Sequence, residues 1–331
     1  MTPTQRCGGL SFHCAVVAGL LLAAAAARAV VQPPPGPALP PVTESKSPDI
    51  DEVQVIATEP RYVAPTRRDS IGRIWAPVVI NGRGPYRLVL DTGASHSGIT
   101  EQVASSLGIS LEGSRSVLLR GVTGSMPVPS IHVDTLSVGE LEMDATMLPI
   151  VTDALGGAEG VLGSEGLFDK RIYIDFRHDL IMISQSRNQR AGIRFFTVPF
   201  EFSRGNLLMV RGMIGEASCN VIIDTGAQMS IGNLALRQAL QHHGPHTRGA
   251  RAEVQGVTDD IQRGDFIDIP PIVLGELKIT NAQATFGDMR IFEHWSLTNE
   301  PTLLLGMDAL GVFDILIIDY GRHELQIRPW R

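Results

Sequence analysis

The chain has 331 residues, of which 44% are hydrophobic and 19% are charged, a composition that is typical of a globular protein and excludes a largely disordered one. Its net charge is −7, and its Lys and Arg residues are scattered, which excludes a basic stripe for binding nucleic acid. The length suffices for two small hydrophobic cores or one larger bilobal core.

Residues 1–29 have the pattern of a secretory signal peptide. A short region with Arg6 precedes an apolar run from Ala15 to Ala27, and the small-residue sequence Ala27-Arg28-Ala29 predicts cleavage near Ala29. An uncleaved membrane anchor is the alternative, but the apolar run is only about thirteen residues, shorter than the ~20 that a spanning helix needs. We therefore expect export to the periplasm or cell envelope.

Residues 30–70 are predicted to form a Pro-rich linker, which is also a candidate pro-segment. The sequence Gln32-Pro33-Pro34-Pro35-Gly36-Pro37 favours an extended, weakly structured spacer. Because Cys7 and Cys14 lie in the signal peptide, the mature chain would keep only Cys219, and a single cysteine cannot form an internal disulfide.

The remainder of the chain predicts a mainly β protein. From Ile74 onward, short apolar or alternating runs are separated by Gly, Pro and Asn, which is typical of many short strands joined by tight turns. We expect only a few short helices, with candidates at Glu101–Leu107, Gly166–Lys170, Leu234–Gln241 and Asp308–Leu310.

An internal repeat divides this body into two copies. Asp91-Thr92-Gly93-Ala94 follows an apolar strand and recurs as Asp224-Thr225-Gly226-Ala227, also after an apolar strand. Further landmarks return in the same order: Gly121-Val122-Thr123 as Gly256-Val257-Thr258, Gly139-Glu140-Leu141 as Gly275-Glu276-Leu277, Gly160-Val161-Leu162-Gly163 as Leu303-Leu304-Leu305-Gly306, and Ile174-Asp175-Phe176 as Ile318-Asp319-Tyr320. We predict two homologous lobes, residues 71–190 and 191–331, related by a pseudo-two-fold axis.

The repeat predicts that Asp91 and Asp224 meet at this axis. A carboxylate at the end of an apolar strand is costly to bury alone, but two equivalent loops brought together on an axis supply each carboxylate with a partner. Two carboxyl groups in contact cannot both ionise, so they share one proton. The ionised member can activate a water while the neutral member donates to a carbonyl oxygen, without a metal or a covalent intermediate.

The residues after each aspartate suit this arrangement. Gly93 and Gly226 allow sharp turns and close approach, and Thr92 and Thr225 offer hydroxyls for hydrogen bonds between the lobes. Ala94 and Ala227 provide no hydroxyl to stabilise the ionised carboxylates, so we expect an activity optimum that is only mildly acidic.

These motifs resemble the retropepsin-like aspartic proteases, particularly exported bacterial members, here duplicated into a single pepsin-like bilobal chain. The resemblance covers nearly everything from Ile74 to the C-terminus. It rests on Asn81-Gly82-Arg83-Gly84-Pro85-Tyr86 before the first Asp-Thr-Gly-Ala, on Leu162-Gly163 and Leu305-Gly306, and on the Ile-Asp-Phe/Tyr strands near Asp175 and Asp319.

The resemblance implies two retropepsin-like β-barrel lobes and flap hairpins that close over an extended peptide or protein substrate. The flap residues would be Gly121, Val122, Thr123 and Gly124 in the first lobe, and Gly256, Val257 and Thr258 in the second. It implies no cofactor, no metal and no nucleic acid partner. Because both half-sites belong to one chain, it also implies activity as a monomer.

Other readings of single motifs are weaker. Asp-Thr-Gly can be a simple strand-ending turn, but its duplication argues against that. Asp134-Thr135 lacks the glycine, and His96 has no counterpart at Met229. Asp175 and Asp319 suit structural roles. A zinc reading of His242, His243 and His246 lacks nearby Cys or carboxylate ligands, so a solvated loop is favoured.

Three functional hypotheses follow. An aspartic endopeptidase accounts for both carboxylates, and a non-catalytic peptide-binding or scaffolding module of the cell envelope is the alternative, which loss of one aspartate would have favoured. A glycosidase with paired carboxylates would need its carboxyl groups about 5 Å or more apart.

Overall fold

The computed structural model describes residues 62–65, 73–138, 141–143, 146–152, 156–187, 189–203, 206–241, 249–258 and 260–330. The predicted signal peptide lies outside this part, as does the linker apart from residues 62–65. Residues Glu59–Arg331 form one compact unit. No helix in the described part is long and apolar enough to cross a membrane.

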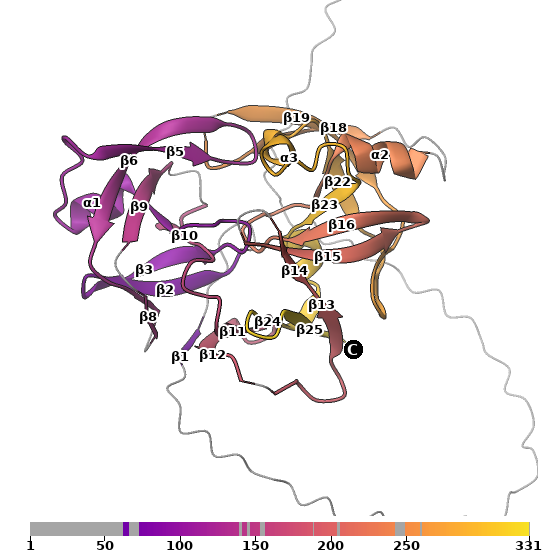
Figure 1. Cartoon of the computed structure of the whole chain (residues 1–331), viewed down its shortest axis with the longest axis horizontal. Coiled ribbons are helices and arrows are strands. Elements are labelled where there is room, and N and C mark those ends of the chain that lie inside the picture. Colours follow the sequence, from indigo (N-terminus) through magenta and orange to yellow (C-terminus); the bar gives the residue numbers. More distant parts are fainter. Residues whose placement is uncertain are drawn as a thin grey trace, which may run out of the picture. The chain divides into compact units, whose positions relative to one another are not determined.

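The first lobe is built on a nine-stranded sheet with the strand order β5-β6-β9-β4-β10-β3-β2-β7-β8 (Figure 1). Two neighbouring pairs, β3 with β10 and β4 with β9, are parallel. The strands of this sheet are β2 (Trp75–Ile80), β3 (Arg83–Leu90), β4 (Gly98–Thr100), β5 (Arg115–Arg120), β6 (Ser125–Val133), β7 (Leu136–Val138), β8 (Leu141–Met143), β9 (Thr146–Val151) and β10 (Gly160–Leu162).

The second lobe repeats this sheet strand for strand, in the order β18-β19-β22-β17-β23-β16-β15-β20-β21, with β14 added beside β15. The parallel pairs recur as β16 with β23 and β17 with β22. Its strands are β14 (Glu201–Ser203), β15 (Leu207–Ile214), β16 (Ala217–Ile223), β17 (Ile231–Gly232), β18 (Ala250–Gln255), β19 (Ile261–Asp268), β20 (Ile272–Leu274), β21 (Leu277–Ile279), β22 (Gln283–Phe286) and β23 (Thr302–Leu305).

A six-stranded sheet joins the lobes, in the order β1-β12-β11-β24-β25-β13. Its centre is the antiparallel pairing of β11 with β24, in which Tyr173 faces Ile317. Tyr173 lies two residues before Asp175, and Ile317 lies two residues before Asp319, so they are equivalent positions of the repeat. The pseudo-two-fold axis therefore passes between them. The strands are β1 (Tyr62–Pro65), β11 (Lys170–Asp175), β12 (Leu180–Gln185), β13 (Phe196–Pro199), β24 (Phe313–Asp319) and β25 (Glu324–Pro329).

The outer strands β1 and β13 show that the duplication begins before Ile74. Tyr62 pairs with Ile183 and Pro65 with Leu180, while the equivalent strand β13 pairs Phe196 with Ile327 and Pro199 with Glu324. Residues 62–65 thus belong to the central sheet, although the sequence grouped them with the linker. The prediction of a mainly β fold with two homologous lobes is confirmed.

Four short helices lie in the described part: α1 (Glu101–Ser106), α2 (Leu234–Gln241), α3 (Arg290–His294) and α4 (Met307–Leu310). Three of them match predicted helices. The predicted helix at Gly166–Lys170 is wrong: Gly166 has a positive φ of 77°, and Lys170 already begins β11. The helix α3 was not predicted, because five residues are too short to show a helical period.

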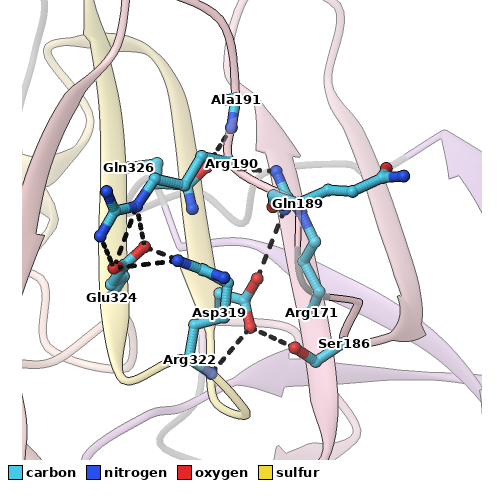
Figure 2. Close-up of polar contacts among 9 residues, drawn as sticks. All are labelled: Arg171, Ser186, Gln189, Arg190, Ala191, Asp319, Arg322, Glu324 and Gln326. Carbon is cyan, nitrogen blue, oxygen red and sulfur yellow. Dashed lines mark hydrogen bonds and ion pairs between the residues drawn. The ribbon is translucent and has the colours of Figure 1, made fainter.

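A polar network ties the connector between the lobes, which includes Ser186, Gln189 and Arg190, to the central sheet (Figure 2). Fully buried Asp319 of β24 accepts hydrogen bonds from Ser186 Oγ and from Arg171 Nη1, the latter at 3.4 Å. Arg190 Nε and Arg322 Nε each donate to Glu324 Oε2 at 3.1 Å. Arg171 of the first lobe also donates to Gln189 O, at 2.7 Å, so the connector is held by charged groups from both lobes.

Glu324 makes this network sensitive to acid. Its hydrogen bonds with Arg190, followed by those with Arg322, lower the pKa of Glu324 to about 2, although partial burial opposes this. A carboxylate whose pKa is lowered by folding stabilises the protein above its unfolded pKa of about 4.3, and this contribution is lost as the pH falls towards 2.

We predict that Glu324→Gln lowers the free energy of unfolding by about 1–3 kcal/mol at pH 7, because two arginines lose a charged acceptor. Urea unfolding at several pH values measures this. The difference between variant and wild type should shrink as the pH falls from 5 to 3. The exposed Glu201→Gln is the control, and a difference independent of pH would contradict the account.

Candidate active site

The two Asp-Thr-Gly-Ala loops begin where β3 and β16 end, and each loop binds its own aspartate. Gly93 N and Ala94 N donate to Asp91 Oδ1 at 2.9 and 3.0 Å. Gly226 N and Ala227 N donate in the same way to Asp224 Oδ1 at 2.9 and 3.1 Å. Each strand ends in buried residues, so its carboxylate emerges from a fixed support at the junction of the lobes.

The two threonines exchange hydrogen bonds across the axis. Thr92 Oγ1 donates to Ile223 O at 2.7 Å and accepts from Thr225 N at 3.1 Å. Thr225 Oγ1 donates to Leu90 O at 2.6 Å and accepts from Thr92 N at 3.2 Å. Both threonines are buried. Four hydrogen bonds therefore fix the position of one loop against the other.

The glycines of the motif are required by the close approach of the loops. A Cβ atom on Gly93 would lie 2.6 Å from Asp224 Oδ2, and one on Gly226 would lie 2.2 Å from Asp91 Cγ. No side chain can occupy either position without displacing the opposite aspartate. Each glycine thus leaves the space into which the other lobe's carboxyl group projects.

Asp91 and Asp224 form a hydrogen-bonded pair with shifted ionisation. Burial raises the pKa of Asp91, whereas the hydrogen bond with Asp224, the backbone donors of its loop and the charge of Arg73 lower it. Burial, then the negative charge of Asp91, raises the pKa of Asp224 well above its usual value. Because the ionisation of each carboxyl group depends on the charge of the other, the two aspartates titrate as a pair.

Arg73 explains part of this asymmetry. Its side chain is buried, and its charge stabilises ionised Asp91. In the first lobe Trp75 pairs with Val89, and in the second lobe Met209 pairs with Ile222, the residue equivalent to Val89. Arg73 lies two residues before Trp75, and its equivalent two residues before Met209 is Leu207. Asp224 lacks the corresponding cation. The difference between Arg73 and Leu207 is visible when the two copies of the repeat are aligned, although Arg73 was not predicted from the sequence.

The predicted flaps are two hairpins whose tips touch each other, as Figure 1 shows for β5-β6 and β18-β19. Gly121 N donates to Gly124 O at 2.8 Å and closes the first tip. The buried hydroxyls of Thr123 and Thr258 form a hydrogen bond of 3.1 Å between the tips. The flap residues named from the sequence are thus brought together, although they lie on different lobes.

Each flap tip also reaches the opposite lobe. Val122 O accepts from Ile291 N at 3.3 Å, and Val257 O accepts from Thr152 Oγ1 at 3.1 Å. Val257 packs with Ala94 on the first-lobe cluster of Val89, Val151, Ala158 and Val161. Val122 packs with Ala227 on the second-lobe cluster of Leu207, Ile222, Ile231, Met289, Ile291, Phe292, Trp295, Leu297 and Leu304.

Comparison with known families agrees with this geometry. A family model described as aspartyl protease matches the chain twice, over residues 76–165 and 210–309. The chain belongs to the aspartyl protease family. Each match contains one Asp-Thr-Gly-Ala loop, as expected for a duplicated single chain. No curated protein matches the chain.

Other residues of this aspartyl protease that were considered from the sequence form no hydrogen bond with Asp91 or Asp224 among the described residues. Asp134 is exposed in a turn, and His96 contacts only the neighbouring Ser95 among the hydrogen bonds of the described part. Asp175 accepts hydrogen bonds from the backbone of Arg177 and His178, which is a structural role. His242, His243 and His246 lie outside the described residues.

Within the described residues of the protease, no group of three or more His, Cys, Asp or Glu side chains could hold a metal ion.

Two serines and two carboxyl groups behind the catalytic loops were not predicted from the sequence: Ser97, Glu165, Ser230 and Asp308. The repeat does contain a sequence pattern that could have revealed them. Each serine lies six residues after the catalytic aspartate of its lobe, and each acidic residue lies two residues after the glycine of the Leu-Gly pair.

We predict that Thr92→Val destabilises the protease by about 2–4 kcal/mol, because it leaves buried Thr225 N and Ile223 O without their partner. Urea unfolding measures the effect. Thr92→Ser keeps the hydroxyl and should lose less than about half of that amount. Equal losses for the two variants would show that the hydroxyl is not what joins the loops.

Proposed function

We propose that the chain is an endopeptidase that hydrolyses peptide bonds in extended polypeptide, with Asp91 and Asp224 as its catalytic residues. The observation that carries this proposal is the close approach of the two carboxyl groups at the junction of the lobes, where each projects into the space left by the glycine of the opposite catalytic loop. Membership of the aspartyl protease family supports a hydrolase acting on protein. Thr92, Gly93, Ala94, Thr225, Gly226 and Ala227 would support the two carboxyl groups.

The proposed reaction needs one ionised and one protonated aspartate. Asp91 removes a proton from a water, whose oxygen attacks the carbonyl carbon of the scissile bond, while Asp224 donates its proton to the carbonyl oxygen. The resulting tetrahedral intermediate collapses when the proton held by Asp91 passes to the leaving nitrogen. One hydroxyl of the intermediate returns its proton to Asp224, which restores the pair without a covalent intermediate.

The substrate would lie between the flap tips and the aspartates as an extended chain. The backbone of such a peptide can hydrogen-bond with the flap hairpins, and its alternating side chains can fill pockets on either side. The apolar clusters beside Ala94 and Ala227 favour apolar side chains next to the scissile bond. Because the flap tips are in contact, they would have to separate for a substrate to enter.

Two other functions receive less support. A non-catalytic peptide-binding module would not require two buried carboxyl groups that share a proton, since their burial is costly. A glycosidase needs carboxyl groups about 5 Å or more apart, and hydrogen-bonded carboxyl groups are closer than that.

We further propose that the enzyme is exported to the periplasm or cell envelope after removal of residues 1–29, and that it acts as a monomer. The signal-like sequence supports export. The presence of both half-sites in one compact unit supports activity without a second chain.

We predict that Asp91→Asn and Asp224→Asn each lower kcat by at least about 10³-fold, because either change removes the general base or the shared proton. Cleavage of an unfolded protein by the chain without residues 1–29 measures this, with and without a statine-type inhibitor. Folded wild-type protein that binds peptide but never cleaves it would favour the binding module.

The pH profile provides a separate prediction. As the pH falls through the lower pKa of the pair, Asp91 is protonated and the rate decreases; as it rises through the upper pKa, Asp224 loses its proton and the rate decreases again. Because burial raises both pKa values, we expect the optimum in initial-rate assays to be only mildly acidic. A rate that increases steadily to pH 8 would contradict this.

A further inference from the structure

Behind the first catalytic loop lies a serine that is held by a carboxyl group. Ser97 N donates to Glu165 Oε1, and Gly163 N donates to Ser97 Oγ at 3.0 Å. Beside them, Ser164 N donates to Ala94 O at 2.9 Å and Asp91 N to Leu162 O at 3.0 Å. The segment with Glu165 therefore supports both ends of the loop that carries Asp91.

The second lobe has an equivalent arrangement. Ser230 Oγ donates to Asp308 Oδ1 at 2.8 Å, and Gly306 N donates to Ser230 Oγ at 3.1 Å. Met307 N donates to Ala227 O at 2.8 Å, and Asp224 N donates to Leu305 O at 3.0 Å. Each catalytic loop is thus backed by a serine and an acidic side chain at matching positions of the repeat.

The surroundings of these two carboxyl groups favour their neutral form. Ser97 and Ser230 are each 1% exposed, and Glu165 Oε2 is buried without a hydrogen-bond partner in the described part of the protein. Within that part, neither carboxyl group forms an ion pair with Lys or Arg; His96 is the titratable group that faces Glu165. Burial raises the pKa of Glu165 and of Asp308, and it outweighs the hydrogen bonds from Ser97 and Ser230, which lower these pKa values.

We propose that Glu165 and Asp308 are positioning residues that hold the two catalytic loops in their active arrangement only while they are protonated. This rests on the proposed endopeptidase function. A neutral carboxyl group can remain against its loop, whereas an ionised one must be hydrated, and water drawn in at Oε2 would separate Glu165 from Ser97. The decline of activity at high pH then depends on four carboxyl groups rather than on the catalytic pair alone.

Amide variants test this, because Gln and Asn have the shape of the protonated acids and cannot ionise. We expect Glu165→Gln, Asp308→Asn and the double variant to keep kcat within about twofold of wild type at pH 4. At the higher pH where wild-type kcat has fallen tenfold, the double variant should retain at least threefold more activity than wild type. Glu165→Ala should lower kcat about 10- to 100-fold at pH 4, because the loop loses its support, and by a smaller factor at the higher pH, where wild type has lost that support as well.

The controls are Glu112→Gln and Asp288→Asn, exposed carboxylates whose replacement should leave the pH profile unchanged. A high-pH decline of the double variant that superimposes on that of wild type overturns the proposal, whatever the melting temperatures show.

If wild type shows no cleavage that depends on Asp91, the proposed function fails, and the melting temperature alone decides the role of the carboxyl groups. Acids whose pKa values are raised by folding lose their stabilising contribution as the pH rises through those values. The double variant should therefore gain in melting temperature relative to wild type between pH 4 and 8. A constant difference overturns the proposal.

Discussion

The exchange of hydrogen bonds between Thr92 and Thr225 is the constraint on which the rest of the structure depends. Each hydroxyl donates to the last carbonyl of the opposite strand, Ile223 O or Leu90 O, so the ends of β3 and β16 are fixed relative to one another. Once these ends are fixed, Asp91 and Asp224 have no room to separate, because Gly93 and Gly226 bring each carboxyl group against the opposite loop. The proposed sharing of one proton between the two carboxyl groups follows from this geometry.

The remainder of the fold supports that junction from three sides. Below it, the pairing of β11 with β24 makes one sheet from both lobes, and the network of Asp319 and Glu324 fixes the connector to the same sheet. Behind it, Leu162 and Leu305 accept the backbone hydrogen bonds of the aspartates. Opposite these supports, the two flap tips cross to the partner lobe. A symmetric scaffold thus surrounds a pair in which Arg73 acts on one aspartate only.

The sequence predicted the features that repeat and missed those that depend on tertiary contacts. Two lobes and the loops of Asp91 and Asp224 could be recognised because identical residues recur in order, whereas the flap segments were implied by the resemblance to retropepsin-like proteases. The strand at residues 62–65 could not be recognised, because four residues are too few to show an alternation of apolar and polar side chains. This strand is defined by its pairing with β12. Glu165 and Asp308 were not recognised because the two copies have different acidic residues at this position. Arg73 was not recognised because the equivalent residue of the second lobe is a leucine. The helix predicted at Gly166–Lys170 does not form, because Gly166 makes a turn with positive φ before β11.

The most direct test of the account is to count protons on the pair. NMR titration of ¹³C-labelled aspartate carboxyl groups, with Asp91→Asn and Asp224→Asn to assign the signals, reports how Asp91 and Asp224 ionise. The account predicts two well-separated steps that belong to the pair, with one proton shared between them, and a single step for the remaining aspartate in each variant. Two independent titrations near the ordinary value of about 3.9 would contradict the claim that the locked loops force the carboxyl groups to share a proton.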